Sequence, residues 1–247
     1  FKYFADGALG SRGAKLIEPY HDDPHNDGLF LNDSSYFAKE AKELYENGFQ
    51  MNTHCIGDAA NRMILNVYAN TLKETNDKRW RIEHAQIVNP ADLEKFGQYN
   101  IIPSVQPTHA TSDMYWLEER LGKERMKTAY SWKDLLNQNG LIALGTDFPI
   151  EDNDPLKTFY AAVIRKDEKN YPEGGFQMEN SLSRQEALRG MTIWAAMSNF
   201  EEDKKGSLEI GKDADFIILD QDLMKATAEE ILKAKVQATY VNGEKVY

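Results

Sequence analysis

Short apolar stretches and longer amphipathic stretches alternate along most of the chain. The short ones are apolar or β-branched, which predicts strands over residues 2–4, 49–53, 80–83, 101–105 and 141–145. The longer ones repeat apolar residues at helical spacing, which predicts helices over residues 35–46, 59–73, 90–99, 132–138 and 155–165. This alternation indicates βαβ units and a parallel sheet.

The pattern changes in two places. Residues 112–128 separate the fourth and fifth strands and are charged, aromatic and helix-prone, which indicates an inserted loop or an extra helix. After a helix predicted over residues 184–197, the segment 206–220 is extended and punctuated by glycine, and residues 236–246 read as a hairpin around Asn242-Gly243, a strong turn signal. We therefore expect two domains, 1–200 and 201–247, of which the second is β-rich.

Composition excludes several classes of protein. The apolar content of 41% and charged content of 28% are ordinary for a globular chain of 247 residues. The net charge of −11 argues against a nucleic-acid partner, and no apolar run approaches the roughly 18 residues of a membrane span. A single cysteine excludes an intrachain disulfide. The compartment is close to unreadable, with the cytoplasm slightly favoured.

Candidate chemistry gathers at the predicted strand ends. Lys2 lies in the first strand, His54 ends the second, His84 ends the third, His109 follows the fourth, and Asp147 ends the fifth. In a parallel α/β barrel the carboxyl ends of the strands open onto one face, where active sites are built. Imidazole and carboxylate groups suit a divalent ion such as zinc.

Each of these residues also has a purely structural interpretation. A single histidine at a strand end is more often a hydrogen-bonded structural residue than a ligand, Glu83 and Arg81 can form an ion pair, and Asp147 can cap a turn. Cys55 adjoins His54 in the same strand, so the two side chains face opposite ways and a Cys–His nucleophilic pair is disfavoured. The shared placement at strand ends favours the metal site.

Five segments resemble the amidohydrolase superfamily, specifically its YtcJ-like branch, which includes N-substituted formamide deformylases. They are Lys2-Tyr-Phe-Ala-Asp-Gly-Ala-Leu-Gly-Ser-Arg-Gly-Ala14, His54-Cys-Ile-Gly-Asp-Ala-Ala60, Arg81-Ile-Glu-His-Ala-Gln86, Ser104-Val-Gln-Pro-Thr-His109 and Gly145-Thr-Asp-Phe-Pro149. The tail Gly206-Ser-Leu-Glu-Ile-Gly-Lys-Asp-Ala-Asp-Phe-Ile-Ile-Leu-Asp220 resembles the segment that returns to a β-sandwich in such enzymes.

The resemblance implies a TIM-like (β/α)8 barrel with a β-sandwich, of which this chain would supply strands four to eight and a small C-terminal sandwich portion. By that resemblance His54, His84 and Asp147 bind one or two divalent ions, zinc by expectation, and a carboxylated Lys2 bridges them. The implied reaction is hydrolysis of an amide-like C–N bond by a metal-activated water, with Asp147 as general base and then general acid.

Four further residues are candidates for contact with a small amide-like substrate: His109, Arg12, Tyr115 and Trp116. His109 is a candidate donor to the developing oxyanion. For Arg12 a surface role is equally compatible with the sequence, and for Tyr115 and Trp116 so is packing of an extra helix.

One departure from the resemblance is large. The first-strand His-x-His pair is absent, because the histidines are at positions 21, 25, 54, 84 and 109. The expectation is an incomplete enzyme that begins at strand four, whose own activity is in doubt and whose open sheet edges invite association with copies of itself or a companion chain. A non-catalytic subunit, a metal-barrel deaminase and a phosphoesterase remain alternatives.

Overall fold

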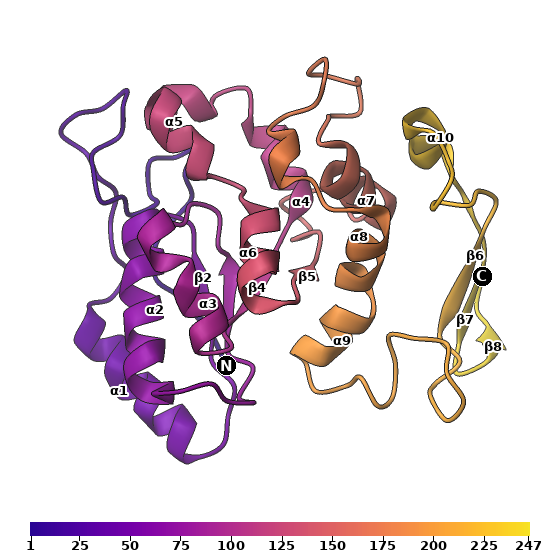
Figure 1. The fold of residues 1–247 in the computed structure, drawn as a ribbon, viewed down its shortest axis with the longest axis horizontal. Helices are drawn as coiled ribbons and strands as arrows, with labels where there is room; N and C mark the ends of the chain where they lie inside the picture. Colours follow the sequence, from indigo (N-terminus) through magenta and orange to yellow (C-terminus); the bar gives the residue numbers. More distant parts are fainter. The chain divides into compact units, whose positions relative to one another are not determined.

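The structure, a computed structural model, describes all 247 residues as a mixed α/β chain. It divides into two compact units: unit 1 comprises Phe1–Val105 and Ser112–Ile142, and unit 2 comprises Gln106–Thr111 and Ala143–Tyr247. This division differs from the predicted domains 1–200 and 201–247, which stay a prediction. Figure 1 labels the helices and strands along the chain.

Four parallel strands form the centre of unit 1: β1 (Lys2–Phe4), β2 (Asn52–Cys55), β3 (Arg81–His84) and β4 (Ile102–Val105). The register pairs Phe4 with His54 and Cys55 with His84. Thr53, whose hydroxyl contacts Tyr68 in the following helix, and its register partner Ile82 are fully buried, as expected for a parallel sheet covered by helices. The predicted parallel arrangement is confirmed for these strands, whereas closure of a barrel stays a prediction.

The helices of unit 1 begin where the sequence provides caps. The Asp33 carboxylate accepts from the N–H of Tyr36 and starts α1 (Ser34–Glu46), which packs against α2 (Asp58–Leu72) beside the strands in Figure 1. The Asn89 side chain caps a 3-10 turn, η1 (Pro90–Asp92), and α3 (Glu94–Gln98) follows. The single helix predicted over residues 90–99 is therefore two short ones.

Strand β2 begins later than the sequence predicted. The N–H of Phe49 donates to the carbonyl of Leu44, which keeps Phe49 in the turn that ends α1. Pairing with β1 starts only at Asn52, whose N–H donates to the carbonyl of Phe1. The consequence is a strand of Asn52–Cys55, with His54 near its carboxyl end.

The predicted insertion at residues 112–128 is helical. It contains the end of α4 (Pro107–Asp113), then α5 (Leu117–Arg125) and the 3-10 turn η2 (Met126–Thr128), and α6 (Trp132–Asn139) comes next. The backbone of Gly122 has φ of 74°, which interrupts α5 before its last turn. Of the two alternatives for this segment, extra helix is the correct one.

Unit 2 contains a short strand, β5 (Ala143–Leu144), on which α8 (Arg184–Met191) and α9 (Ile193–Ser198) pack. Helix α7 (Pro155–Ile164) packs against α8 and α10 (Ala228–Lys233), and η3 (Met178–Asn180) lies between α7 and α8. The helix predicted over residues 184–197 breaks at Thr192, whose φ of −126° and ψ of −98° are not helical. The Thr192 hydroxyl donates to the carbonyl of Leu188 and so provides that carbonyl with a hydrogen-bond donor at the end of α8.

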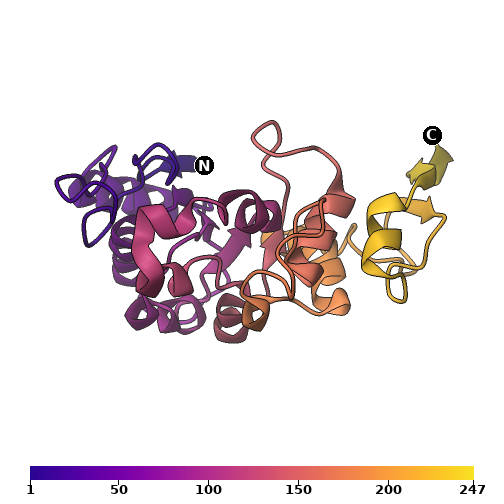
Figure 2. The same cartoon turned by 90° about the horizontal axis from the view of Figure 1, so that it is seen from above.

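The C-terminal part of unit 2 is an antiparallel sheet of β6 (Phe216–Leu219), β7 (Val236–Val241) and β8 (Glu244–Lys245), drawn in yellow with α10 in Figure 2. The turn at Asn242 and Gly243 has positive φ at both positions, 52° and 79°, as a type I′ hairpin requires. The predicted hairpin is confirmed.

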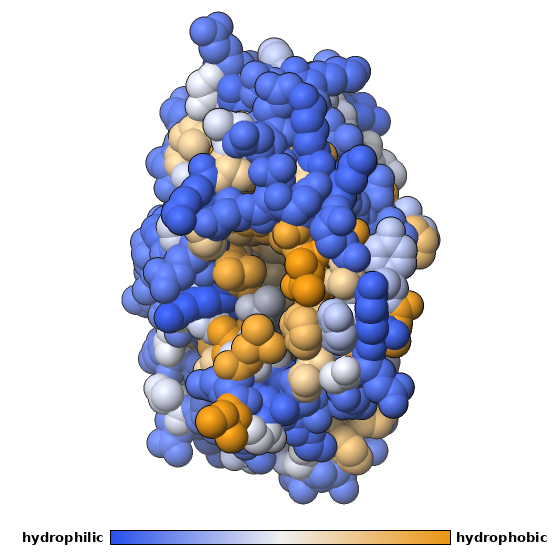
Figure 3. Space-filling view, turned by 90° about the vertical axis from the view of Figure 1, so that its right-hand side faces the viewer, coloured by the Kyte–Doolittle hydropathy of each residue, from blue (hydrophilic) through white to orange (hydrophobic).

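Apolar side chains of this sheet reach the surface. Ile217 and Ile218 are 47% and 46% exposed, and Leu208 and Ile210 before β6 are more exposed still. Figure 3 looks onto the side that carries the C-terminal segment and shows apolar side chains gathered among polar ones. None of the helices in the chain combines the length and hydropathy that crossing a bilayer requires.

Candidate metal centre

His54 and His84 lie at the carboxyl ends of the adjacent strands β2 and β3. Their rings are in edge contact, with centroids 4.5 Å apart and planes at 72°. The His54 side chain is 11% exposed and His84 is buried. Two neighbouring imidazoles with little exposure to solvent have the chemistry of a pair of ligands for one divalent ion.

The backbone of His84 is what brings its ring to this position. In the register of β2 and β3, His84 pairs with Cys55, so a regular strand would direct its side chain away from that of His54. However, His84 has φ of 72° and Ala85 has φ of 42°, both in the left-handed region. Such backbone conformations cost about 1–3 kcal/mol each and concentrate at functional sites.

A buried carboxylate, Asp6, lies behind His54. Its Oδ1 is 3.5 Å from His54 Nε2, an ion-pair contact longer than a normal hydrogen bond. The N–H of Ile56 donates to Oδ1 at 3.0 Å, and those of Gly57 and Lys15 donate to Oδ2 at 2.8 and 2.9 Å. Burial raises the pKa of Asp6 to about 7, and these backbone hydrogen bonds act in the opposite direction.

Close packing holds the turn after β2. A Cβ on Gly57 would lie 2.0 Å from the Lys15 carbonyl oxygen, so only glycine fits there. The buried Asn61 amide donates to the carbonyls of Gly57 and Ile87, both at 3.0 Å, and so joins the turns after β2 and β3. The sequence segment from His54 to Ala60 therefore folds into a rigid support for the strand end.

Other polar groups on this face have partners of their own. Arg81 Nε donates to Glu83 Oε1 at 2.9 Å, which is the ion pair that the sequence had offered as a structural alternative. The ammonium group of Lys2 lies over the Phe4 ring, 5.1 Å from its centroid, and that ring contacts His54 at 5.2 Å. Lys2 is thus on the same side as His54, with Phe4 between them.

Cys55 is fully buried. Burial raises the pKa of its thiol well above the usual value, and the Asp6 carboxylate adds to the rise. A thiol in such surroundings is a poor nucleophile, which argues against the Cys–His pair.

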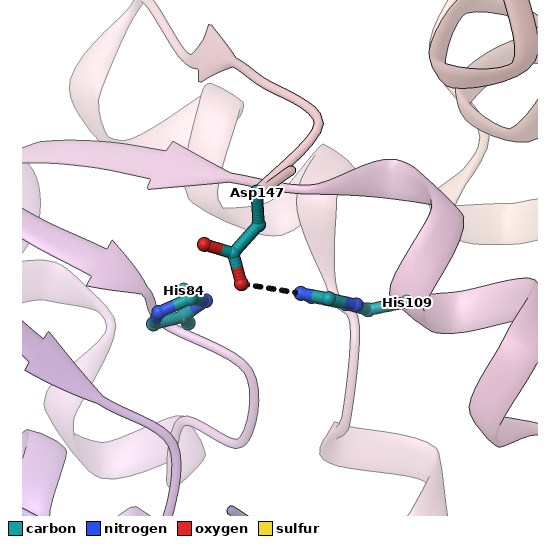
Figure 4. A group of neighbouring side chains, drawn as sticks. All are labelled: His84, His109 and Asp147. Carbon is teal, nitrogen blue, oxygen red and sulfur yellow. Dashed lines mark hydrogen bonds and ion pairs between the residues drawn. The ribbon is translucent and has the colours of Figure 1, made fainter. Parts of the chain in front are cut away.

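Unit 2 holds a second polar cluster, at the turn after β5 and on α4. His109, at the start of α4, has Nε2 3.3 Å from Asp147 Oδ2 and Nδ1 2.9 Å from Glu151 Oε1. Figure 4 shows the Asp147 carboxylate directed at the His109 ring, and it also draws His84 of unit 1. Asp147 has φ of 59°, so it too has a left-handed backbone conformation at a strand end.

The three remaining substrate candidates all lie in unit 1. Arg12 forms a two-point ion pair with Asp22, at 2.8 and 3.2 Å, which is compatible with the surface role. Trp116 packs at Gly10 and stacks on the Arg120 guanidinium, while Tyr115 is 57% exposed. Their contact with substrate stays a prediction.

Sequence reasoning missed three residues around the histidines: Asp6, Asn61 and Glu151. Asp6 lies within the first segment that carries the resemblance and Asn61 directly follows the second, and an acid beside glycine in Asp6-Gly7 reads equally well as a turn. Their role depends on backbone groups brought from residues 15, 56 and 87, which no local spacing reveals. Glu151 reaches His109 across 42 residues of chain.

Comparison with known protein families and sequences identifies relatives of this chain. All of residues 1–247 match the amidohydrolase family, and the chain belongs to it. It is 35% identical to the protein YtcJ of Bacillus subtilis (strain 168), a match that covers 100% of this chain and 46% of YtcJ. It is 39% identical to the protein LONG AFTER FAR-RED 3 of Arabidopsis thaliana, over 100% of this chain and 42% of that protein. The resemblance to the YtcJ-like branch is confirmed.

Two further matches are consistent with this branch. The N-substituted formamide deformylase of Arthrobacter pascens is 25% identical over 98% of this chain and 44% of its own length. A crystal structure of an uncharacterised metal-dependent hydrolase from Pyrococcus horikoshii OT3 superimposes with a TM-score of 0.81 at 34% identity, over 92% of this chain and 45% of that one. The chain spans less than half the length of these proteins.

Proposed function

We propose that this chain carries metal ligands and the proton-transfer acid of a metal-dependent hydrolase that acts on an amide-like C–N bond. The observation that carries the proposal is the contact between the His54 and His84 rings at adjacent strand ends, with the Asp6 carboxylate behind His54. Membership of the amidohydrolase family and the likeness to a metal-dependent hydrolase support it. The name of the formamide deformylase supports the choice of a C–N bond.

The donor chemistry fits a divalent ion. His84, His109 and Asp147 offer imidazole nitrogens and a carboxylate oxygen, a donor set that suits such an ion, and His54 adds a further imidazole. We assign His54, His84 and Asp147 as the residues that would hold one or two ions, zinc by expectation, together with a carboxylated Lys2. A bound ion would lower the pKa of a water molecule and polarise the substrate carbonyl.

The protein's own groups then move protons and orient the substrate. Asp147 accepts a proton from the attacking water and delivers it to the leaving nitrogen, as general base and then general acid. His109, whose Nδ1 is held by Glu151, is the proposed donor to the carbonyl oxygen, through Nε2 once that nitrogen is released from Asp147. Arg12, Tyr115 and Trp116 are the proposed contacts to the remainder of a small amide-like substrate.

Association is part of the proposal. Exposed Ile217 and Ile218 on β6 support contact of the C-terminal sheet with another chain, either a second copy or a companion.

Metal binding by this chain tests the proposal directly. The wild-type chain, stripped with a chelator and titrated with Zn²⁺, should bind the ion, and the double variant His54→Ala, His84→Ala should lose at least about 100-fold in affinity because two ligands are gone. Cys55→Ser is the matched control, since it changes the neighbouring buried residue and should bind like wild type. Equal affinity of the double variant and wild type would refute the ligand assignment.

The bond type needs a separate measurement. A chain extended to the full length of its relatives should be assayed on panels of amides, phosphoesters and amino-heterocycles. Turnover confined to the amides is expected. Turnover confined to either of the other panels would replace the proposed reaction with phosphoester hydrolysis or deamination.

A further inference from the structure

We infer that Gln86 is a specificity-determining residue whose side-chain oxygen accepts a hydrogen bond from the N–H of a secondary amide substrate. This role rests on the C–N hydrolysis proposed above and adds to it a substrate class, amides that carry one hydrogen on the scissile nitrogen. Gln86 and the residues that hold its side chain all belong to unit 1.

Gln86 lies in the turn after β3, two residues beyond His84. Its Cα is within about 7 Å of the His84 Cα, because two residues of extended chain span no more than that. The residue is only 3% exposed, so protein encloses most of its side chain. A small amide bound beside His84 at this strand end is within reach of Gln86.

Two oxygens decide which end of the Gln86 amide points into the protein. Nε2 lies 3.1 Å from Asp113 Oδ2 and also donates to the Tyr130 hydroxyl, which in turn donates to the same Asp113 oxygen. A carboxylate only accepts hydrogen bonds, so the NH₂ group of Gln86 has to face Asp113. The carbonyl oxygen of the amide, Oε1, is consequently turned away from Asp113 and Tyr130.

The support of this amide has a conformational cost. Tyr130 is fully buried and has φ of 56°, in the left-handed region that a bulky aromatic residue rarely adopts. Its N–H donates to the Gln86 main-chain carbonyl at 2.7 Å, so both the main chain and the side chain of Tyr130 bind Gln86. The main-chain bond holds the turn, and the phenol in addition fixes the amide. Backbone strain of this kind concentrates at functional sites.

The result is a fixed acceptor that the chain itself does not use. Gln86 Oε1 accepts no hydrogen bond from the chain, and it is not among the enclosed polar atoms, so it faces solvent-accessible space. An acceptor held in this way binds an N–H or O–H of a ligand and disfavours the analogue that lacks it. In an amide the N–H closest to the reacting carbon is on the scissile nitrogen. A secondary amide therefore fits, whereas an N,N-disubstituted amide leaves the oxygen without a donor.

The test compares two substrates in a full-length enzyme that contains this chain, N-butylformamide and N-butyl-N-methylformamide. In the wild type, kcat/KM for the first should exceed that for the second by at least about 10-fold. Gln86→Met should reduce this ratio about 5–10-fold, because methionine has the length of glutamine but lacks the amide oxygen. The different intrinsic reactivities of the two amides cancel when the ratios of the two enzymes are compared.

Gln50→Met is the matched control. Gln50 precedes β2, and its Nε2 donates to the main-chain carbonyl of Arg79, which precedes β3. The variant therefore makes the same substitution and loses a hydrogen bond of the same kind, but at the amino ends of the strands. Its ratio of kcat/KM values should equal that of the wild type.

The outcomes separate the substrate class from the reaction. An unchanged ratio in Gln86→Met overturns the role of Gln86, and so does a wild-type enzyme that hydrolyses both amides equally well. If Gln86→Met does not fold, Gln86→Asn takes its place with the same expected fall in the ratio, because it withdraws the oxygen by one methylene. Turnover of neither amide refutes the proposed C–N hydrolysis and the role of Gln86 together, whereas amide hydrolysis without the preference refutes only the role of Gln86.

Discussion

The turns after β2 and β5 both carry residues of the candidate site, but they differ in how closely the surrounding residues pack against them. After β2, Gly57 is buried and in contact with the Lys15 backbone, and Asp6 and Asn61 bind the surrounding peptide groups. After β5, Gly145 has no neighbour within 4 Å of its Cβ position, and Phe148 and Ile150 are 63% and 73% exposed. One strand end is enclosed and the other is open.

The difference matches the tasks proposed for the two turns. A metal ligand gains from a fixed ring, because the geometry of the donor atoms decides affinity. A group that exchanges protons with water and a leaving nitrogen has to be accessible, and the Asp147 side chain is 35% exposed. The enclosed turn therefore suits His54, which is proposed only as a ligand, and the open turn suits Asp147, which is proposed to transfer protons as well as to bind metal.

The largest effect on activity is expected from a substitution in the open turn after β5. In a full-length enzyme that contains this chain, Asp147→Asn should lower kcat by about 10²–10⁴-fold, because the amide cannot accept the proton. The free energy of unfolding should change by less than about 0.5 kcal/mol, since the side chain is partly exposed and asparagine tolerates left-handed backbone. Rates and denaturant unfolding measure the two quantities.

The control for this variant is Asp152→Asn, five residues along the same segment. Asp152 forms an ion pair with Lys157, away from the proposed chemistry, so its loss should leave kcat within about twofold of wild type. Similar losses of kcat in both variants would show that the loop as a whole, rather than the Asp147 carboxylate, supports the reaction.

The position of the turn after β2 could be predicted from the sequence, but the contacts that hold this turn could not. Alternation of apolar and amphipathic stretches located β2 and α2, and their order placed His54 at a strand end. Strand β2 begins at Asn52 rather than Phe49 because Phe49 is bound to the end of α1, a contact that strand propensity does not encode. The position of the His84 ring depends on a positive φ at a non-glycine residue, which propensity disfavours.

The second expected effect concerns stability and separates the two turns. Gly57→Ala should lower the free energy of unfolding by about 1–3 kcal/mol, because its Cβ would lie 2.0 Å from a backbone oxygen. Gly145→Ala should be neutral or slightly stabilising, since the new methyl meets open space and restricts the unfolded chain. Equal costs for the two variants in urea unfolding would contradict the contrast between an enclosed and an open turn.

The smallest expected effect is a pH dependence of stability that comes from the carboxylate at the start of α2. Burial raises the pKa of Asp58 above its usual value, although hydrogen bonds from Ile17 and Ala59 oppose the rise. The unfolded chain therefore loses this proton at a lower pH than the folded chain does. Between the usual pKa of aspartate and the raised folded value, the folded state binds more protons, so stability falls as pH rises.

Asp58→Asn should remove that fall, so its free energy of unfolding should decline less than that of wild type as pH increases through this range. Asp22 gives the opposite sign, because the hydrogen bond from Arg12 lowers the pKa of its carboxyl and so adds stability that is lost as pH decreases. Urea unfolding of both variants across the acidic range measures the two slopes. If Asp58→Asn and Asp22→Asn change the slope in the same direction, burial is not what distinguishes the enclosed turn from the exposed surface.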